Sequence, residues 1–227
     1  MNYPEILFED NHLIAVNKKP GDIVQGDKTG DEPLSDKIKS YIKAKYNKPG
    51  EVFLGTIHRI DRPVSGVVLF ARTSKALERM NEQFREREVQ KVYWAVVKNI
   101  PDPETATLVN YLIKDEAKNK SRAYDAPRSG ATRCELSYTL VRKSDRYALL
   151  EINPLTGRHH QIRVQLSKIG CPIKGDLKYG FDRSNPDGSI HLHARKLNFQ
   201  HPVLKGPVEI TAPVPEEPLW KFFELYN

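Results

Sequence analysis

Short apolar runs separated by polar turns dominate the chain, and this pattern predicts a fold rich in β-strands. Residues 67–71 (VVLFA) are the clearest case, because the run is β-branched and aromatic throughout and therefore typical of a buried strand. Runs of the same kind, joined by turns that contain Pro, Gly, Asn or Asp, occur at residues 6–8, 13–16, 89–97, 106–113, 121–124, 132–141, 147–152, 191–199 and 208–211. Close strands joined by short turns favour an antiparallel arrangement.

Three stretches show the spacing of an amphipathic helix instead, and Pro218 is expected to start a short final helix. Residues 34–46 place Leu34, Ile38, Ile42 and Tyr46 on one face, with lysines between them. A second helix is expected after Thr73 or Ser74, either of which is a suitable N-cap. A third follows Thr156, a further candidate cap, with its buried face at residues 162, 166 and 169 and its end at Gly170.

Length and composition favour a single folded domain over residues 1–227. The chain has 227 residues, of which 39% are hydrophobic, enough for a sizeable core. Strands and helices together predict an α/β domain with a mixed, mostly antiparallel central sheet flanked by helices. We expect a catalytic cleft to cross that sheet.

The charge balance points to a polyanionic partner. The formal net charge is +7 and the sequence pI is about 9.3, which suits nucleic acid, although many basic proteins bind none. The lysines of residues 37–48 fit either a solvated helix face or a surface that contacts phosphates. Two cysteines, Cys134 and Cys171, form neither a disulfide framework nor a zinc site by spacing, so ordinary thiols are expected. Without a signal-peptide pattern or a membrane-spanning run, a cytoplasmic location is expected.

The densest cluster of chemical groups is residues 58–66, HRIDRPVSG, directly before the buried run at residues 67–71. A histidine, two arginines and a carboxylate stand within five residues, on a loop that a core strand would hold in place. Loops supported in this way often carry binding and catalytic groups. A solvated loop with local Arg–Asp pairing is the alternative that the charges alone leave open.

Two further stretches carry candidate functional residues. In residues 89–97, alternation places Tyr93 on the same face as Lys91, where it could line a cleft or simply lie half-buried on a sheet. In the helix after Thr156, Arg163 flanks the apolar stripe, so a carboxylate partner is expected, because burying a lone charge is costly. The paired residues His159 and His160 suggest zinc, but no Cys or Glu stands at ligand spacing.

These stretches together resemble one family. HRIDRPVSG resembles the signature of the RluA-type pseudouridine synthases, HRLD followed by Arg or Lys and then Ser-Gly, with Ile60 in place of the usual Leu. KVYWAVV (residues 91–97) is similar to the family's second motif, Lys-x-Tyr-x-Ala. LTGRHHQIRVQL (155–166) is similar to the third, and CPIKGDLKYG (171–180) to the turn Pro-Ile-x-Gly-Asp-x-x-Tyr-Gly. The opening residues 6–21 and the stretch LHARKLNFQHPV (192–203) are also similar, so the resemblance covers nearly the whole chain.

The resemblance implies roles for particular residues. It places the catalytic aspartate at Asp61, the tyrosine that stacks on the target base at Tyr93, and the arginine that pairs with the aspartate at Arg163. Arg59, Arg62 and Arg158 are further candidates for binding the RNA substrate. It implies a pseudouridine synthase-like fold and uridine isomerisation in rRNA or tRNA, without a metal or organic cofactor. Because the resemblance begins near the first residue, we expect no S4 RNA-binding domain ahead of it, and we expect a monomer.

Two other functions stay open at this point. An RNA-binding protein of the same fold without activity would be expected to lack the carboxylate or the stacking tyrosine, and both are present here. A metal-dependent nuclease or phosphatase using Asp61 and the histidines would need a second carboxylate close to Asp61, and none stands beside it in the sequence. Activity in the presence of EDTA would separate the metalloenzyme from the synthase.

Overall fold

The computed structural model describes residues 3–26 and 30–225, and the described chain is a mixed α/β protein with mostly antiparallel strand pairing, as predicted. It divides into two compact units. Unit 1 comprises the described residues up to Gln90 together with Ala194–Glu217, and unit 2 comprises Lys91–His193 together with the described residues from Pro218 onward. That the whole chain is one domain stays a prediction. No helix within the described residues is long and apolar enough to cross a membrane.

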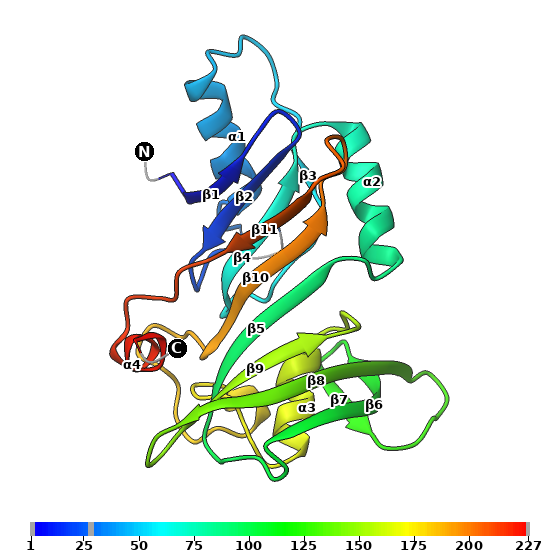
Figure 1. Ribbon diagram of the computed structural model, residues 1–227, viewed down its shortest axis with the longest axis vertical. Coiled ribbons are helices and arrows are strands. Elements are labelled where there is room, and N and C mark those ends of the chain that lie inside the picture. The colour runs from blue at the N-terminus through cyan, green and yellow to red at the C-terminus, as the bar shows by residue number, and fades with distance from the viewer. Residues whose placement is uncertain (1–2, 27–29, 226–227) are drawn as a thin grey trace. The chain divides into compact units, whose positions relative to one another are not determined.

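Unit 1 combines the N-terminal strands with two strands from late in the chain. Its elements are β1 (Glu5–Glu9), β2 (Leu13–Lys18), α1 (Leu34–Lys45), β3 (Gly55–Thr56), β4 (Ser65–Ala71), α2 (Ser74–Arg85), β10 (Leu192–Gln200, from Ala194 on) and β11 (Pro207–Thr211). The strand order is β1-β2-β4-β10-β11, with β3 also paired to β4. Figure 1 shows the orange and brown β10 and β11 beside the blue and cyan strands of the first 71 residues.

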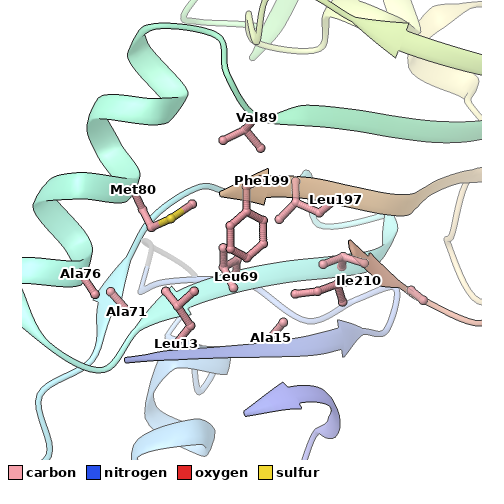
Figure 2. Packing of buried hydrophobic residues seen from close by; sticks show 12 residues of the cluster. Leu13, Ala15, Leu69, Ala71, Ala76, Met80, Val89, Leu197, Phe199 and Ile210 are labelled. Atoms are coloured by element: carbon pink, nitrogen blue, oxygen red, sulfur yellow. The ribbon is translucent and has the colours of Figure 1, made fainter. Parts of the chain in front are cut away.

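The core of unit 1 explains why β4 is buried along its whole length. All seven residues of this strand are buried, which confirms the prediction made from its apolar run. Leu69 packs with Met80 of α2, with Phe199 of β10 and with Ile210 of β11 (Figure 2). The neighbouring positions Val68 and Phe70 face the opposite side of the sheet and are also fully buried. A strand covered on both faces reads as a continuous hydrophobic run, and this one does.

Both predicted helices of unit 1 form. Thr73 is the N-cap of α2, and its side chain accepts a hydrogen bond from the backbone N–H of Ala76 at 3.2 Å, as predicted. In α1, Leu34, Ile38 and Ile42 are buried. The placement of Tyr46 on that buried face was wrong. Tyr46 is the C-cap and 45% exposed, because the helix ends at Lys45, and its hydroxyl donates to Glu9.

Unit 2 is an antiparallel meander with a helix against it. Its elements are β5 (Gln90–Val97), β6 (Thr105–Asp115), β7 (Lys120–Tyr124), β8 (Thr132–Lys143), β9 (Ala148–Pro154), α3 (Gln161–Lys168), the 3₁₀ turn η1 (Leu177–Tyr179) and α4 (Pro218–Glu224). The strand order is β5-β9-β8-β6-β7, and α3 lies against β6 and β7 (Figure 1). Buried Leu112, Cys134, Val164 and Tyr179 pack together between them.

The prediction for α3 is correct at the C-terminal end of the helix but wrong at Ile169 and at Thr156. The helix ends before Gly170, which adopts the left-handed φ of +80° expected at this position. Ile169, predicted to be buried, is 36% exposed, because the helix stops at Lys168 and Ile169 lies at its C-cap. Thr156 is not the cap, because the helix begins only at Gln161 and His160 takes the N-cap position with a φ of 54°.

Replacing Gly66 of the HRIDRPVSG stretch would test how closely β4 approaches β10. Its φ is +114°, and a Cβ placed there would lie 2.3 Å from the backbone oxygen of Ala194 on β10. Gly21 is the matched control in unit 1, because its φ is +90° but a Cβ placed there would meet nothing within 4 Å. Replacement by alanine should cost about 1–2 kcal/mol of strain at either site. Gly66→Ala should lose about 1–3 kcal/mol more, from the backbone clash. Urea unfolding measures both, and equal losses would contradict the close-approach argument.

Candidate active site

The residues predicted to act in catalysis or binding fall into two groups, one in each unit. Asp61, Arg59 and Arg62 belong to the loop between β3 and β4 of unit 1. Tyr93 on β5, Arg158 and Arg163 belong to unit 2. That the two groups converge on one cleft stays a prediction.

A backbone turn shapes the Asp61 loop, and the two arginines of the loop are exposed. Asp61 is half-buried, and its carbonyl accepts a hydrogen bond from the N–H of Val64 at 3.0 Å, which forms the turn into β4. Arg59 and Arg62 are exposed. Arg62 pairs with Asp31 at 2.6 Å between Nη2 and Oδ2, in a contact that is about half open to solvent. Such an exposed pair adds little to stability and leaves the arginine available to a ligand.

His58, the first residue of the motif, has a structural contact on β4. Its Nε2 atom accepts a hydrogen bond from the backbone N–H of Leu69 at 3.0 Å. Its ring stacks on Phe84 of α2, with ring centroids 5.1 Å apart. An accepting Nε2 carries no proton, so the ring is held in the Nδ1–H tautomer. His58 therefore fixes the start of the loop against the sheet, three residues before Asp61.

Lys18, at the end of β2, holds the other end of the loop. The side chain is 1% exposed, and its Nζ donates to the carbonyl oxygens of Lys19 (3.0 Å), Arg62 (3.0 Å) and Val64 (2.7 Å). The Arg62 carbonyl also accepts the backbone N–H of Gly21 at 2.9 Å. One buried amine thus ties two residues of the Asp61–Val64 turn to β2. Sequence reasoning missed Lys18, although it stands in the family-like stretch NKKPG.

Burial sets the protonation of Lys18. Removal from water lowers its pKa from 10.5 to about 7, while the nearby carboxylates of Asp22 and Asp61 act to raise it. Three carbonyl acceptors match the three N–H donors of an ammonium group. The clamp is therefore complete when Lys18 is protonated, and the nearby negative charges help to keep it so.

In unit 2, Tyr93 lies on β5 opposite Ile152 of β9. The side chain is half-buried, and the following residues Trp94 and Ala95 are buried on the two faces of the strand. Tyr93 is thus a partly exposed aromatic residue on a rigid strand.

Arg163 is buried in α3 with a carboxylate partner, as expected for an arginine at this position. It is 5% exposed, and Asp176, its partner, is 1% exposed. Its Nε and Nη2 atoms donate to Asp176 Oδ2 and Oδ1 at 2.7 and 2.8 Å, in the bidentate geometry that fixes a guanidinium plane. The guanidinium carbon lies 5.1 Å from the ring centre of Tyr179. Asp176 was not among the predicted site residues, although it stands in the family-like turn CPIKGDLKYG.

Arg158 is exposed at the tip of a loop that the side chain of Gln161 organises. Gln161 Oε1 accepts the hydroxyl of Thr156 at 2.7 Å and the backbone N–H of Arg158 at 3.1 Å. Gln161 Nε2 donates to the carbonyl of Glu135 on β8 at 3.0 Å. Thr156, predicted to cap the helix, instead belongs to this loop support. The loop is consequently attached to the sheet and presents Arg158 to solvent.

His159 and His160 form a stacked pair, with ring centroids 3.7 Å apart. His159 Nδ1 lies 2.9 Å from the hydroxyl of Ser121, and its Nε2 lies 3.0 Å from Asn119 Oδ1. His160 Nδ1 lies 2.8 Å from the hydroxyl of Tyr179. Burial, reinforced by the positive charge of Arg163, lowers the pKa of His160 to about 2, so this ring is neutral. Across the described residues, no three His, Cys, Asp or Glu side chains are grouped as a metal site.

Comparison with models of known protein families shows which family the chain belongs to. A family model described as RNA pseudouridylate synthase matches residues 12–168, which include Asp61, Tyr93, Arg158 and Arg163. The chain belongs to the RNA pseudouridylate synthase family. This confirms the resemblance found in the sequence motifs.

Individual relatives cover most of the chain. It is 33% identical over 218 residues to the ribosomal large subunit pseudouridine synthase C of Vibrio vulnificus (strain CMCP6), a match that spans 93% of this chain and 66% of that protein. The protein of the same name from Escherichia coli (strain K12) is 34% identical over 222 residues, with 93% and 66% covered. The chain thus spans about two thirds of the length of these relatives.

Solved structures agree with the family assignment. Human RNA pseudouridylate synthase domain containing 4 superimposes with a TM-score of 0.80 at 26% identity, covering 98% of this chain and 93% of that one. Human RNA pseudouridylate synthase domain containing 1 has a TM-score of 0.74 at 22% identity and covers 97% and 87%. The second likeness concerns the fold alone.

Lys18 gives this family member a testable dependence of stability on pH. Its pKa is about 7 in the folded protein and 10.5 as the ordinary value, so between these pH values the unfolded chain binds a proton that the folded chain lacks. The contribution of Lys18 to the free energy of unfolding therefore rises with pH across this window, by up to about 1.4 kcal/mol per pH unit, and is constant below pH 7. Lys18→Met should remove this slope.

The measurement is urea unfolding of wild type and variant at several values between pH 7 and 10. The difference between their free energies of unfolding is the quantity of interest, because other groups titrate equally in both. Lys43→Met, at an exposed position of α1, serves as the control and should keep the wild-type slope. Parallel curves for wild type and Lys18→Met would contradict the assignment.

Proposed function

We propose that this protein is an RNA pseudouridine synthase that isomerises one or more uridines of rRNA or tRNA to pseudouridine, with Asp61 as the catalytic residue. The observation that carries the proposal is the Asp61 loop: a chain of this family holds an aspartate half-exposed on a loop fixed by His58 and Lys18. The bacterial relatives are named for the large ribosomal subunit, which favours rRNA over tRNA. A cytoplasmic location and a monomeric state go with this proposal.

The reaction conserves all atoms of the nucleotide. The glycosidic bond between N1 and C1′ breaks, the base turns, and C5 forms the new bond to C1′. The proton on C5 is lost and N1 gains one, so there is no net change in oxidation state. A carboxylate at Asp61 fits two roles, attack on carbon as a nucleophile or removal of a sugar proton as a base. Both mechanisms assign catalysis to Asp61.

The other candidate residues fit roles around a flipped nucleotide. A base inside a duplex is out of reach and has to leave the stack before chemistry. The half-buried ring of Tyr93, on a strand, offers a flat surface on which the base would lie. Arg163 would orient the carboxylate of Asp61. Exposed Arg59, Arg62 and Arg158 would bind flanking phosphates or fill the vacated stack.

An RNA-binding protein of the same fold without activity is the second candidate. Such a protein would have the same net positive charge and the same family membership as an active synthase. Only a measurement of turnover therefore separates the two functions. A metal-dependent nuclease is tested in the same assay: EDTA should leave isomerisation unchanged, whereas loss of activity in EDTA would favour the metalloenzyme. Comparing pseudouridine maps of RNA from cells with and without the gene would identify the target uridine.

Asp61→Asn is the decisive variant. It keeps the shape of the side chain but removes its charge, and no carboxylate stands beside it in the sequence to take over. The variant should fold, bind RNA at least as well as wild type, and release no detectable tritium from RNA labelled at uridine C5. Asp36→Asn on α1 is the control and should retain full activity, because that side chain is exposed outside the loop. Substantial release by Asp61→Asn would refute the catalytic role.

RNA affinity should fall steeply with salt, because each phosphate contact releases condensed counterions. In filter-binding titrations from 50 to 200 mM salt, Arg158→Gln should weaken binding and reduce the slope of log affinity against log salt by about 1. Arg128→Gln is a control at another exposed arginine of unit 2, where the guanidinium lies over the ring of Tyr124. A salt-independent affinity would contradict the electrostatic part of the proposal.

A further inference from the structure

The turn that carries Asp176 is attached to the strand that carries Tyr93. The backbone N–H of Lys174 donates to the carbonyl of Val96 at 2.9 Å, and Ile173 forms an antiparallel bridge with Val97. The N–H of His191 donates to Lys174 O at 2.9 Å, which closes the turn from its other side. Asp176 consequently projects from a support that is continuous with β5.

Gly175 sets the direction in which Asp176 leaves this support. Its φ is +86°, and a Cβ there would lie 2.8 Å from both the side-chain nitrogen of Asn185 and the backbone oxygen of Ser189. Only glycine satisfies both the left-handed backbone and the lack of space. The backbone N–H of Asp176 then donates to Ile173 O at 3.0 Å, which completes a tight turn.

Arg163 is held on two sides by this turn. In the plane of the guanidinium, both carboxylate oxygens of Asp176 accept from Nε and Nη2. The guanidinium carbon also lies 5.1 Å from the ring centre of Tyr179, whose hydroxyl accepts the N–H of Ser121 on β7 at 2.8 Å and contacts His160 Nδ1 at 2.8 Å. A single ion pair would allow the guanidinium to rotate, whereas a bidentate pair against a fixed ring does not.

From these contacts we propose that Asp176 is a positioning residue for the isomerisation: it holds the guanidinium of Arg163 at a fixed place relative to the strand of Tyr93. The inference rests on the proposed function and deepens it, because it gives the base-stacking residue and the arginine of unit 2 a common support. Asp176 acts through Arg163 and is not required to touch the substrate. A displacement of about 1 Å at such a group can cost on the order of 100-fold in rate.

The first test is Asp176→Asn. The amide keeps one acceptor for Arg163 but loses the charge and the bidentate geometry. We expect kcat for tritium release to fall by about 10- to 100-fold per folded molecule, with KM for RNA within about threefold of wild type. Asp182→Asn is the control, because Asp182 is an exposed carboxylate of the same unit, paired with Lys98, and its loss should change neither constant.

Asp176→Glu keeps the measurement informative if the amide variant fails to fold. It retains the charge but carries the carboxylate one methylene further, so it should fold and still lose kcat, by less than the amide. Full kcat in either folded variant, measured well below its unfolding midpoint, would overturn the inference. A purely structural role would lower the folded fraction and leave kcat per folded molecule and its ratio to KM unchanged.

A double-variant cycle tests whether Asp176 acts through Arg163. Arg163→Met alone should lower kcat strongly, and adding Asp176→Asn should then lower it no further, because the group that Asp176 positions is gone. Independent, multiplying losses would overturn the inference. Its failure is distinguishable from failure of the proposed function: an active Asp61→Asn variant refutes the catalytic residue, whereas full activity of Asp176→Asn beside inactive Asp61→Asn refutes only the positioning role.

Discussion

The contact between the Lys18 ammonium and three backbone carbonyls determines the shape of the Asp61 loop. A loop rich in charged side chains has little apolar surface to bury and would otherwise be ordered only by its turn. Lys18 restrains the loop further, because its ammonium group donates hydrogen bonds to the backbone carbonyls of Arg62 and Val64. Gly66 supplies a second constraint, since only a residue without a Cβ lets β4 approach Ala194 so closely. The carboxylate of Asp61 is thus presented by buried neighbours that themselves do no chemistry.

Unit 2 contains a buried ion pair, Arg163–Asp176, whereas the buried charge beside the Asp61 loop in unit 1 is the single ammonium group of Lys18. A pair such as Arg163–Asp176 contributes little net stability, because both groups have lost their hydration. What it contributes is geometry: the bidentate contact fixes one guanidinium edge, and Tyr179 restricts its tilt. In each unit, hydrogen bonds to a buried cation fix local geometry. In unit 1 backbone carbonyls accept from Lys18, and in unit 2 the carboxylate of Asp176 accepts from Arg163.

The sequence predicted the elements well wherever a periodic apolar pattern existed. The buried strand β4, the cap at Thr73 and the end of α3 before Gly170 follow from local rules and were correct. Errors occurred where a tertiary contact overrides the local pattern. Tyr46 has helical spacing but reaches Glu9, and Thr156 looks like a cap but binds Gln161 across a loop. No sequence pattern reports a hydrogen bond between segments that meet only in the fold, which is why the contacts of Lys18 and the pairing of Arg163 with Asp176 were not predicted.

The arginines of the candidate site show how the same residue type occupies two environments that composition cannot separate. Arg59, Arg62 and Arg158 are exposed, so their charges are screened by solvent, as suits contacts with a phosphate backbone that vary from one substrate to another. Arg163 is buried and held by two bonds, so its field is strong and its direction fixed. A fixed charge suits a group that has to be in place before the substrate arrives, because no energy is then spent on reorienting it during the reaction. The surroundings of each arginine therefore decide which of the two proposed roles, binding or positioning, its charge suits.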